Sequence, residues 1–341
     1  MTKNLYRRND LLAPQGGEGA WGWGMAVERA VVTGGAGFVG SSVVEALAGR
    51  GTSVLVVDDL STGAASNLDR LAGTVELLKH DIRDAGPLRA AFTAFRPDLV
   101  FHLAARTDVR ASMSDPQDDA SVNVLGSINV FGAAAAVGVQ RVVNTSTGGA
   151  IYAPGGPIPT PETAEVAPLS AYGLSKRVVE DYAEWFRCSF GLDVVTLRYG
   201  NVYVPRQDPT GDAGVIAIFC ERLLTGRPLI VFGDGTQTRD FVYVGDVAAA
   251  NLAAADSPDL PHRVYNVGTG TEVSIRELLR ATGRAAGADP DAVVAVPAPR
   301  RPGEVHRSCL DVRRSVAELG LDRPVPLVEG LRRTIGWIRS R

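Results

Sequence analysis

The chain has 341 residues, which is long for one domain and enough for two lobes that share a cleft. Its formal net charge is −3, from 35 basic and 38 acidic residues, so the charge gives no general attraction to nucleic acid or to an anionic membrane surface. With 45% hydrophobic and 21% charged residues the composition is that of a globular protein, and we expect no apolar run of the roughly 20 residues that span a bilayer.

Cysteine and histidine usage predicts neither a disulfide framework nor a metal site. Cys188, Cys220 and Cys309 are isolated and odd in number, and the four histidines share no metal-ligand spacing. We interpret the cysteines as reduced core residues, and this favours a cytoplasmic location.

Residues 1–26 differ from the rest of the chain. Basic residues near the start are followed by no apolar stretch, so a signal peptide is not expected. We predict a disordered extension, or a functional start at Met25. The alternative is a lid or partner-binding arm anchored by Trp21 and Trp23.

From residue 27 onward, short β-branched runs alternate with longer amphipathic runs. Strands are predicted at 30–32, 54–57, 75–79, 99–102, 141–143 and 194–197. Helices are predicted at 41–48, 87–95, 122–137 and 171–190. Continuous apolar strands between helices indicate a parallel sheet that is covered on both faces. The fold class is therefore α/β, a Rossmann-type doubly wound parallel sheet.

Beyond Asn201 this alternation breaks, and a proline-containing loop is followed by shorter elements. We predict a smaller C-terminal α/β lobe that closes over the carboxyl ends of the strands. The sheet domain is assigned residues 27–200 plus about 240–270, and the lobe residues 201–239 plus 271–341.

A glycine fingerprint opens the first predicted helix. Gly34, Gly37 and Gly40 follow the first strand with G-x-x-G-x-x-G spacing, which lets a backbone approach a pyrophosphate at a helix N-terminus. Asp58 ends the second strand, where a carboxylate accepts hydrogen bonds from a ribose and disfavours a 2′-phosphate. The pattern predicts NAD. Asp81 and Ile82, after the third strand, are equally compatible with an adenine contact and with a turn residue beside a core residue.

Tyr172 and Lys176 stand four residues apart, on one face of a predicted helix. A phenol of pKa about 10 is a poor base at neutral pH, and a neighbouring ammonium favours the phenolate. Ser146 and Thr147 end a strand where a hydroxyl can share a hydrogen bond with a reacting oxygen. Of the two we favour Thr147, and Ser146 stays open.

Together these features resemble the extended short-chain dehydrogenase/reductase superfamily. Seven further stretches are similar to its UDP-glucose (UDP-galactose) 4-epimerase branch: residues 58–63, 102–105, 146–152, 197–203, 233–243, 265–270 and 301–304. The resemblance covers roughly residues 29–338. It implies that NAD binds the sheet domain and that a nucleotide sugar binds the lobe.

The resemblance also implies the site residues. The cofactor-binding set is Gly34, Gly37, Phe38, Val39, Asp58, Asp59, Ser61, Thr62, Gly63, Asp81, Ile82, Leu103, Ala104, Ala105, Asn123, Lys176 and Tyr199. The substrate-binding set is Thr107, Arg110, Asn201, Val215, Ile230, Phe232, Arg239, Arg301 and Glu304. Arg239 is also compatible with a structural ion pair to Asp240 or Asp246.

Within this superfamily, dehydratases and decarboxylases carry proton-transfer residues after the strand-end threonine. Here Gly148, Gly149 and Ala150 stand there, and none of them transfers a proton. The sequence therefore predicts NAD-dependent inversion of C4 of a UDP-hexose through a 4-keto intermediate, with no nucleic-acid or membrane partner. The resemblance also implies a homodimer that packs through the predicted helices 122–137 and 171–190.

Two alternatives remain. Gly200 and Ser308 suggest a roomy sugar pocket, in which Arg106 and Arg110 are candidates to pair with the carboxylate of UDP-glucuronate, for a 4-epimerase or a decarboxylase; a solvated surface is an equal reading of both arginines. The second alternative, from another class, is a non-catalytic NAD-binding sensor or scaffold.

Overall fold

The computed structural model describes residues 27–71, 73–203, 214–289, 295–300 and 305–340. Its centre is a seven-stranded parallel sheet in the order β11-β6-β5-β4-β1-β2-β3. The strands are β1 (Arg29–Thr33), β2 (Ser53–Asp58), β3 (Val75–Lys79), β4 (Leu99–His102), β5 (Arg141–Thr147), β6 (Val194–Tyr199) and β11 (Val264–Val267). The predicted Rossmann-type doubly wound sheet is confirmed. The N-terminal extension, Arg301 and Glu304 lie outside the described residues.

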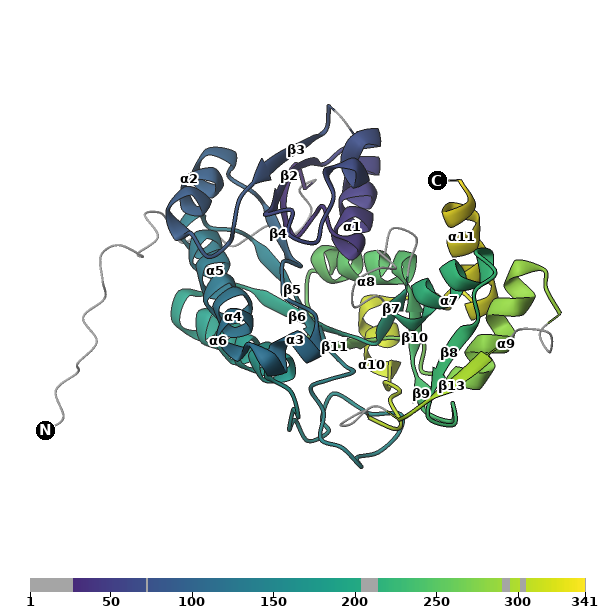
Figure 1. Cartoon of the computed structure of the whole chain (residues 1–341). Coiled ribbons are helices and arrows are strands. Elements are labelled where there is room, and N and C mark those ends of the chain that lie inside the picture. Colours follow the sequence, from purple (N-terminus) through teal and green to yellow (C-terminus); the bar gives the residue numbers. More distant parts are fainter. Residues whose placement is uncertain (1–26, 72, 204–213, 290–294, 301–304, 341) are drawn as a thin grey trace, which may run out of the picture.

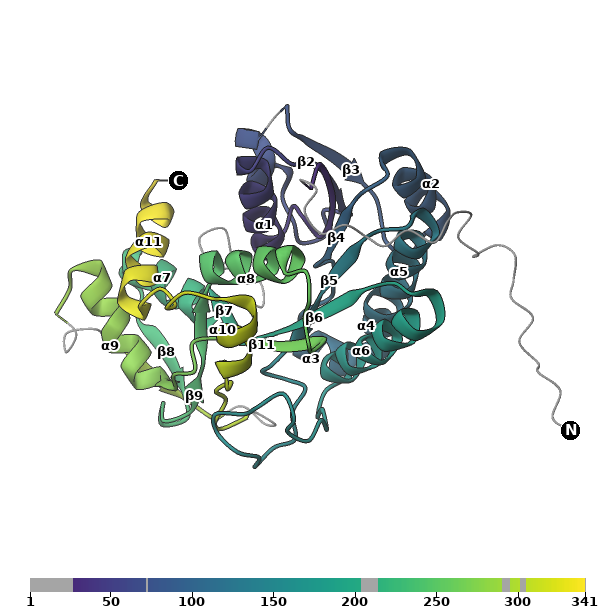
Figure 2. The ribbon, with the colours of Figure 1, turned by 180° about the vertical axis from the view of Figure 1, so that it is seen from behind.

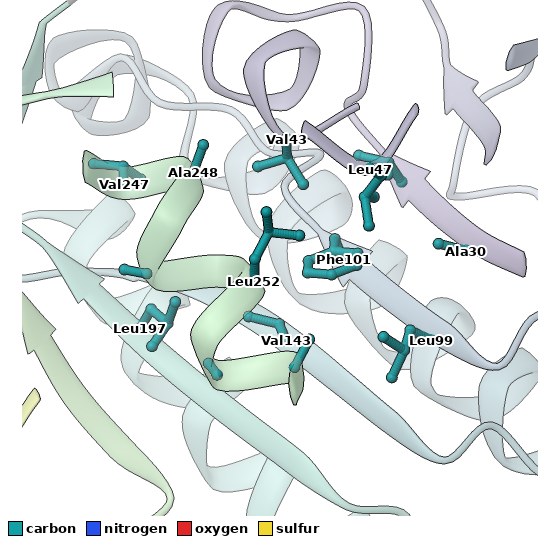
Figure 3. Packing of buried hydrophobic residues seen from close by; sticks show 14 of the residues in the cluster. Ala30, Val43, Leu47, Leu99, Phe101, Val143, Leu197, Val247, Ala248 and Leu252 are labelled. Carbon is teal, nitrogen blue, oxygen red and sulfur yellow. The ribbon is translucent and has the colours of Figure 1, made fainter. Parts of the chain in front are cut away.

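Helices cover both faces of this sheet (Figure 1). One face packs on α2 (Ala85–Phe95), α5 (Gly126–Val137) and α6 (Ala171–Phe190) through a core that includes Phe92 and Phe131. The other face packs on α1 (Phe38–Gly49) and α8 (Val244–Asp256). Figure 3 shows Leu252 of α8 between Val43 of α1 and the strand residues Phe101 and Val143. Burial on both faces explains why the strands are apolar throughout.

Helix α6 has the predicted bounds because both of its ends are capped. The Ser170 side chain accepts a hydrogen bond from the Gly173 N–H, and Gly191 ends the helix at φ +70°. Helix α1 begins at Phe38, earlier than predicted, since the glycine-rich loop turns directly into it.

A continuous helical run precedes β5 and begins earlier than the predicted residue 122. It comprises α4 (Pro116–Ala120), a π-helical turn η2 (Ser121–Leu125) and α5. By length and composition this run is apolar enough to cross a membrane, so the expectation of no such run is wrong. Its polar residues Asp119 and Asn123 are buried against other parts of the protein, as in a core helix.

The late segments build a second core beyond α8 (Figures 1 and 2). Its members include Phe219, Leu278 and Leu331. The elements are α7 (Val215–Leu224), α9 (Ile275–Ala286), α11 (Leu327–Arg339), β8 (Leu229–Phe232) and β13 (Ala295–Ala298), with β13 parallel to β8.

Two short strand pairs connect the lobe to the sheet domain. They are β7 (Asn201–Tyr203) with β10 (Phe241–Tyr243), and β9 (Thr238–Arg239) with β12 (Val273–Ser274). The remaining elements are η1 (Ala65–Leu71), α3 (Val109–Ser114) and α10 (Arg313–Leu319). Helix α10 packs on β11 and α8, with Leu319 in the core of the sheet domain, so this part of segment 271–341 belongs with the sheet.

Candidate active site

The glycine-rich loop brings three segments into close contact. Gly34 has φ +70°, and a Cβ there would stand 2.6 Å from the Ala104 nitrogen after β4. A Cβ on Gly40 would stand 2.0 Å from the Gly34 carbonyl oxygen. The N-cap residue of α1, Gly37, makes no side-chain hydrogen bond to the first turn. The backbone N–H groups at Phe38 and Val39 therefore suit a pyrophosphate, and this cradle fits NAD.

Asp58 joins this cradle to the end of β2. Its carboxylate is 6% exposed and accepts hydrogen bonds from the backbone N–H groups of Ala36 and Leu60, both at 2.9 Å. Burial raises its pKa, and these hydrogen bonds oppose the rise. Asp59 accepts from the Ser61 N–H and hydroxyl, at 2.9 and 2.7 Å. Each carboxylate retains lone pairs for a ribose, which stays our prediction for both.

The rest of this loop and the β3 end lie nearby. Ser61 and Thr62 are exposed, and Gly63 packs against Ala36 of the glycine-rich loop. Asp81 forms an ion pair with Arg83 at 2.6 Å, which lowers the pKa of Asp81. Ile82 is 4% exposed in the core. The structure thus gives Asp81 and Ile82 the turn and core positions that the sequence also allowed.

Asn123 holds the loop that follows β4. Its amide oxygen accepts from the Arg106 N–H at 2.8 Å, and its amide nitrogen donates to the Arg106 carbonyl at 3.0 Å. This pair fixes the backbone just beyond Leu103, Ala104 and Ala105. The Arg106 guanidinium donates to Asp118 at 3.1 Å and to Ser61 at 3.3 Å. It therefore faces the β2 loop, which argues against its proposed pairing with a sugar carboxylate.

The end of β5 meets α6 at the catalytic residues that the sequence predicted. Gly173 permits this approach, because a Cβ there would stand 2.2 Å from the Ala150 carbonyl oxygen. The Lys176 ammonium donates to the Thr145 carbonyl at 3.0 Å, and the Thr147 side chain lies close enough to the Tyr172 phenol to favour a lower pKa of that phenol. The structure brings Tyr172, Lys176 and Thr147 together.

Ser146 makes a different contact. Its hydroxyl donates to Glu180 Oε1 at 2.6 Å, and the residue is 3% exposed. Glu180 is also bound by Arg198, at 2.6 Å. The hydroxyl of Ser146 is thus committed to a buried polar network, and the geometry favours Thr147 as the catalytic hydroxyl.

Burial controls the protonation of this site. It raises the pKa of Tyr172 to about 12; the Thr147 hydrogen bond opposes the rise, and the charge of Asp119 adds to it. Burial lowers the pKa of Lys176 to about 8, against the charges of Asp119 and Glu180. The expected lowering of the Tyr172 pKa by Lys176 is not found among the protein's own groups. Desolvation of the phenolate dominates, and the group that opposes it is Thr147.

The Tyr199 side chain packs on the α8 side of the sheet. It is 6% exposed within that core, and its hydroxyl lies 2.7 Å from Asn251 Nδ2 and 3.3 Å from Thr145 Oγ1. The structure gives this side chain a packing role, and a cofactor contact of Tyr199 stays a prediction.

The predicted substrate residues come from separate elements that face the lobe. The Asn201 N–H donates to the Asp240 carbonyl at 2.7 Å, and its side-chain oxygen is buried without a hydrogen-bond partner among the described residues. The Arg239 Nη1 donates to the carbonyls of Thr238 and Val305, at 2.7 and 2.9 Å.

The other predicted substrate residues fall into two groups that differ in exposure. Val215, Ile230 and Phe232 are half-buried on α7 and β8. Thr107 and Arg110 are exposed beside α3.

Gly200 does not open the pocket as expected. A Cβ there would stand 2.9 Å from the Asp240 carbonyl oxygen, so this side of the residue faces backbone.

Sequence reasoning missed three residues beneath the catalytic pair: Asp119, Ser175 and Glu180. Asp119 accepts from the Ser175 hydroxyl at 2.6 Å. The spacing of Tyr172, Lys176 and Glu180, each four residues apart, was a signal for Glu180. No comparable signal distinguished Asp119 from its neighbour Asp118.

Comparison with known proteins agrees with this geometry. The family model described as "NAD dependent epimerase/dehydratase family" matches residues 30–268. A UDP-glucose 4-epimerase of Mycolicibacterium smegmatis is 42% identical over 315 residues, 92% of this chain and 99% of the relative.

Two solved structures are also similar. The UDP-glucose 4-epimerase of Thermotoga maritima, solved with UDP-glucose, has a TM-score of 0.87 and 41% identity, covering 92% of this chain and 99% of its own. The UDP-glucose 4-epimerase of Thermus thermophilus, complexed with NAD, has a TM-score of 0.82 and 44% identity, covering 91% and 99%. The chain belongs to the NAD-dependent epimerase/dehydratase family.

Proposed function

We propose that this protein inverts carbon 4 of a UDP-hexose, of the UDP-glucose/UDP-galactose type, through a 4-keto intermediate. The support is the site geometry together with relatives at 41–44% identity that are named UDP-glucose 4-epimerases. NAD, when bound, takes up the hydride of carbon 4 and returns it.

Each catalytic side chain has a distinct task in this proposal. Tyr172 accepts the proton of the sugar 4-hydroxyl and later returns it. Thr147 bridges the phenol and the sugar oxygen, so the proton moves along a fixed path. Lys176 holds the cofactor ribose and places a positive charge beside the phenol.

The loop after Thr147 determines whether oxidation at carbon 4 can be followed by elimination. The Gly148 N–H donates to the Tyr199 carbonyl at 2.7 Å, and a Cβ on Gly148 would stand 2.6 Å from Leu310. Neither Gly148, Gly149 nor Ala150 offers a proton. The observation that carries the proposal is therefore a tyrosine base beside a loop that supports reversible oxidation at carbon 4 and no elimination.

We assign the nucleotide to the lobe side of the cleft. The buried Asn201 amide oxygen accepts no hydrogen bond from the described residues, and the Arg239 guanidinium suits a diphosphate. Val215, Ile230 and Phe232 supply apolar surface for the uracil. Arg301 and Glu304 remain predicted contacts.

We also propose a homodimer formed through the α3, α5 and α6 side of the molecule. Four large apolar side chains are exposed on these helices and η2: Met113 at 60%, Leu125 at 58%, Leu174 at 55% and Trp185 at 49%. Apolar side chains gathered on one surface mark an interface. Leu174→Glu is expected to give monomers by light scattering, and an unchanged mass contradicts this face. The cytoplasmic location stays a prediction.

Proton NMR of the purified protein with UDP-glucose, UDP-N-acetylglucosamine and UDP-glucuronate, each without added NAD, tests the function. We expect UDP-galactose from UDP-glucose. A pentose product or a lasting keto sugar would identify a decarboxylase or a dehydratase. No turnover of any sugar, with NAD bound, would favour the sensor alternative.

A further inference from the structure

A buried carboxylate lies beneath the catalytic helix and has no part in the proposed chemistry. Asp119 of α4 is 2% exposed. Its Oδ2 accepts from the Ser175 hydroxyl at 2.6 Å, and its Oδ1 accepts from the Asn123 amide at 3.0 Å. Ser175 stands between Tyr172 and Lys176 on α6. Asp119 thus holds the helix that carries both catalytic residues.

The same carboxylate is linked to the opposite wall of the cofactor site. Asn123, which donates to Asp119, also binds the backbone N–H and carbonyl of Arg106. One chain of hydrogen bonds therefore connects α6, α4 and the loop after β4. A shift of Asp119 would move the catalytic helix relative to the cofactor-lining backbone.

The charge of Asp119 is not neutralised locally. Both of its donors are neutral groups, and within the described residues no cationic side chain forms an ion pair with it. A buried charge without a counter-ion acts strongly on other charges nearby, because little water screens it.

Lys176 is the cation that this field reaches. Among the residues that the structure describes, its ammonium donates one hydrogen bond, to the Thr145 carbonyl, and Lys176 is 5% exposed. The groups that face it are His102 on β4, Asp119 on α4, and Tyr172 and Glu180 on α6, with Arg198 of β6 bound to Glu180. Burial disfavours the ammonium, and Asp119 opposes that effect more strongly than Glu180 does.

We propose that Asp119 is a positioning residue that fixes α6 through Ser175 and favours the charged form of Lys176 by holding a buried carboxylate against the residue that precedes it. The inference rests on the proposed function, because the position and the charge of Lys176 matter for holding the cofactor beside Tyr172. Asp119 touches no reacting atom.

The lysine content of the chain makes a direct test possible. The sequence contains three lysines, Lys3, Lys79 and Lys176. Lys79 is exposed on β3 and Lys3 belongs to the N-terminal extension, so Lys176 is the buried lysine of the described chain. NMR of the NAD-loaded protein with lysine labelled at Cε gives three signals, and Lys176→Arg assigns the one of interest.

The comparison uses Asp119→Asn, which removes the charge, and Ser175→Ala, which removes a hydrogen bond and leaves the charge. We expect Asp119→Asn to lower the pH at which Lys176 titrates by about 1 unit, the size of effect that one nearby charge produces. The alkaline limb of kcat should move the same way. Ser175→Ala should leave the titration near that of the parent.

An unchanged Lys176 titration in Asp119→Asn would overturn the proposal, whatever its activity. If that variant does not fold, Asp119→Ser, which leaves room for water, serves the same measurement. The NMR readout needs no sugar substrate. A shifted titration in a protein that turns over no UDP-hexose would therefore count against the proposed function alone.

Discussion

Two buried carboxylates act on Lys176, and they differ in what neutralises them. Glu180 is 7% exposed and receives the Arg198 guanidinium through two hydrogen bonds, at 2.9 and 2.6 Å, together with the Ser146 hydroxyl. Asp119 receives neutral donors. The region around Glu180 thus contains a matched ion pair, whereas the region around Asp119 contains a net charge.

The difference indicates that Glu180 and Asp119 have separate roles next to α6: Glu180 stabilises the fold, and Asp119 affects the charge of the catalytic residues. Burial opposes the charge of Arg198, but the hydrogen bonds and charge interactions with Glu180 and Tyr152 together outweigh burial and raise the Arg198 pKa. The pair therefore stays ionised and fixes β6 to α6. Its two opposite charges largely cancel, so it exerts only a weak electrostatic effect on other groups. Asp119 is less well neutralised, so its field extends to the catalytic residues. Changes near Glu180 should affect folding, and changes near Asp119 should affect titration.

A third buried group extends the comparison and gives the largest expected effect. His102 is 2% exposed, and burial, with the charge of Lys176, lowers its pKa from 6.5 to about 3. The folded protein therefore binds this proton more weakly than the unfolded chain. Stability should be independent of His102 above pH 6.5 and fall by about 4–5 kcal/mol as the pH drops to 3. Urea unfolding across this range measures it, with His102→Gln as the less acid-sensitive control.

The next effect concerns the Tyr172 phenol, on which the charge of Asp119 acts. Tyr172→Phe should reduce kcat by about 10³-fold, because the general base is lost while the ring still packs. NAD released on denaturation should match the parent, which shows an intact cofactor site. Activity within tenfold of the parent would remove Tyr172 from the mechanism.

Glu180→Gln and Asp119→Asn should differ in their effect on the free energy of unfolding. Glu180→Gln leaves the buried Arg198 guanidinium without its counter-ion, so the free energy of unfolding should fall by about 3 kcal/mol. Asp119→Asn should cost about 1–2 kcal/mol, because it disturbs hydrogen bonds but breaks no ion pair. Chemical denaturation of both variants measures the difference. An equal loss of unfolding free energy in both variants would contradict the separate roles of Glu180 and Asp119.

The smallest expected effect separates two adjacent hydroxyls. Thr147→Ala should lower kcat by about 10- to 100-fold, the value of a hydrogen bond to a charged group. Ser146→Ala should change kcat little and cost about 1 kcal/mol of stability, since its hydroxyl serves Glu180. Steady-state kinetics and thermal unfolding of the pair check this. The opposite ranking in kcat would restore Ser146 as the catalytic hydroxyl.

The sheet and the catalytic pair were predictable because each produces a pattern in a short stretch of the sequence. Strands buried on both faces form apolar runs, the glycine-rich turn has fixed spacing, and Tyr172 and Lys176 share a helix face. The helical run before β5 was placed too late, because Pro116, Asp118 and Asp119 resemble a polar turn in the sequence.

The electrostatic environment of Tyr172 and Lys176 was not predictable from the sequence, because it depends on which charged side chains are buried. Asp118 and Asp119 are adjacent carboxylates, yet the Asp118 side chain is 40% exposed and paired with arginines, whereas Asp119 is buried. Likewise, the spacing of Tyr172 and Lys176 predicted a lowered phenol pKa. It carried no information on desolvation, which raises that pKa to about 12.

The contact between Gly148 and Leu310 limits the order in which this chain could acquire a new reaction. An aspartate at 148 is the simplest route to a proton donor after Thr147, but its Cβ would overlap Leu310, which is 1% exposed in the core. Leu310 would have to move or be replaced by a smaller residue, and the replacement alone would leave a cavity. A proton donor at position 148 therefore depends on a second change in the core, so a single substitution there would lower stability before it could add a new reaction.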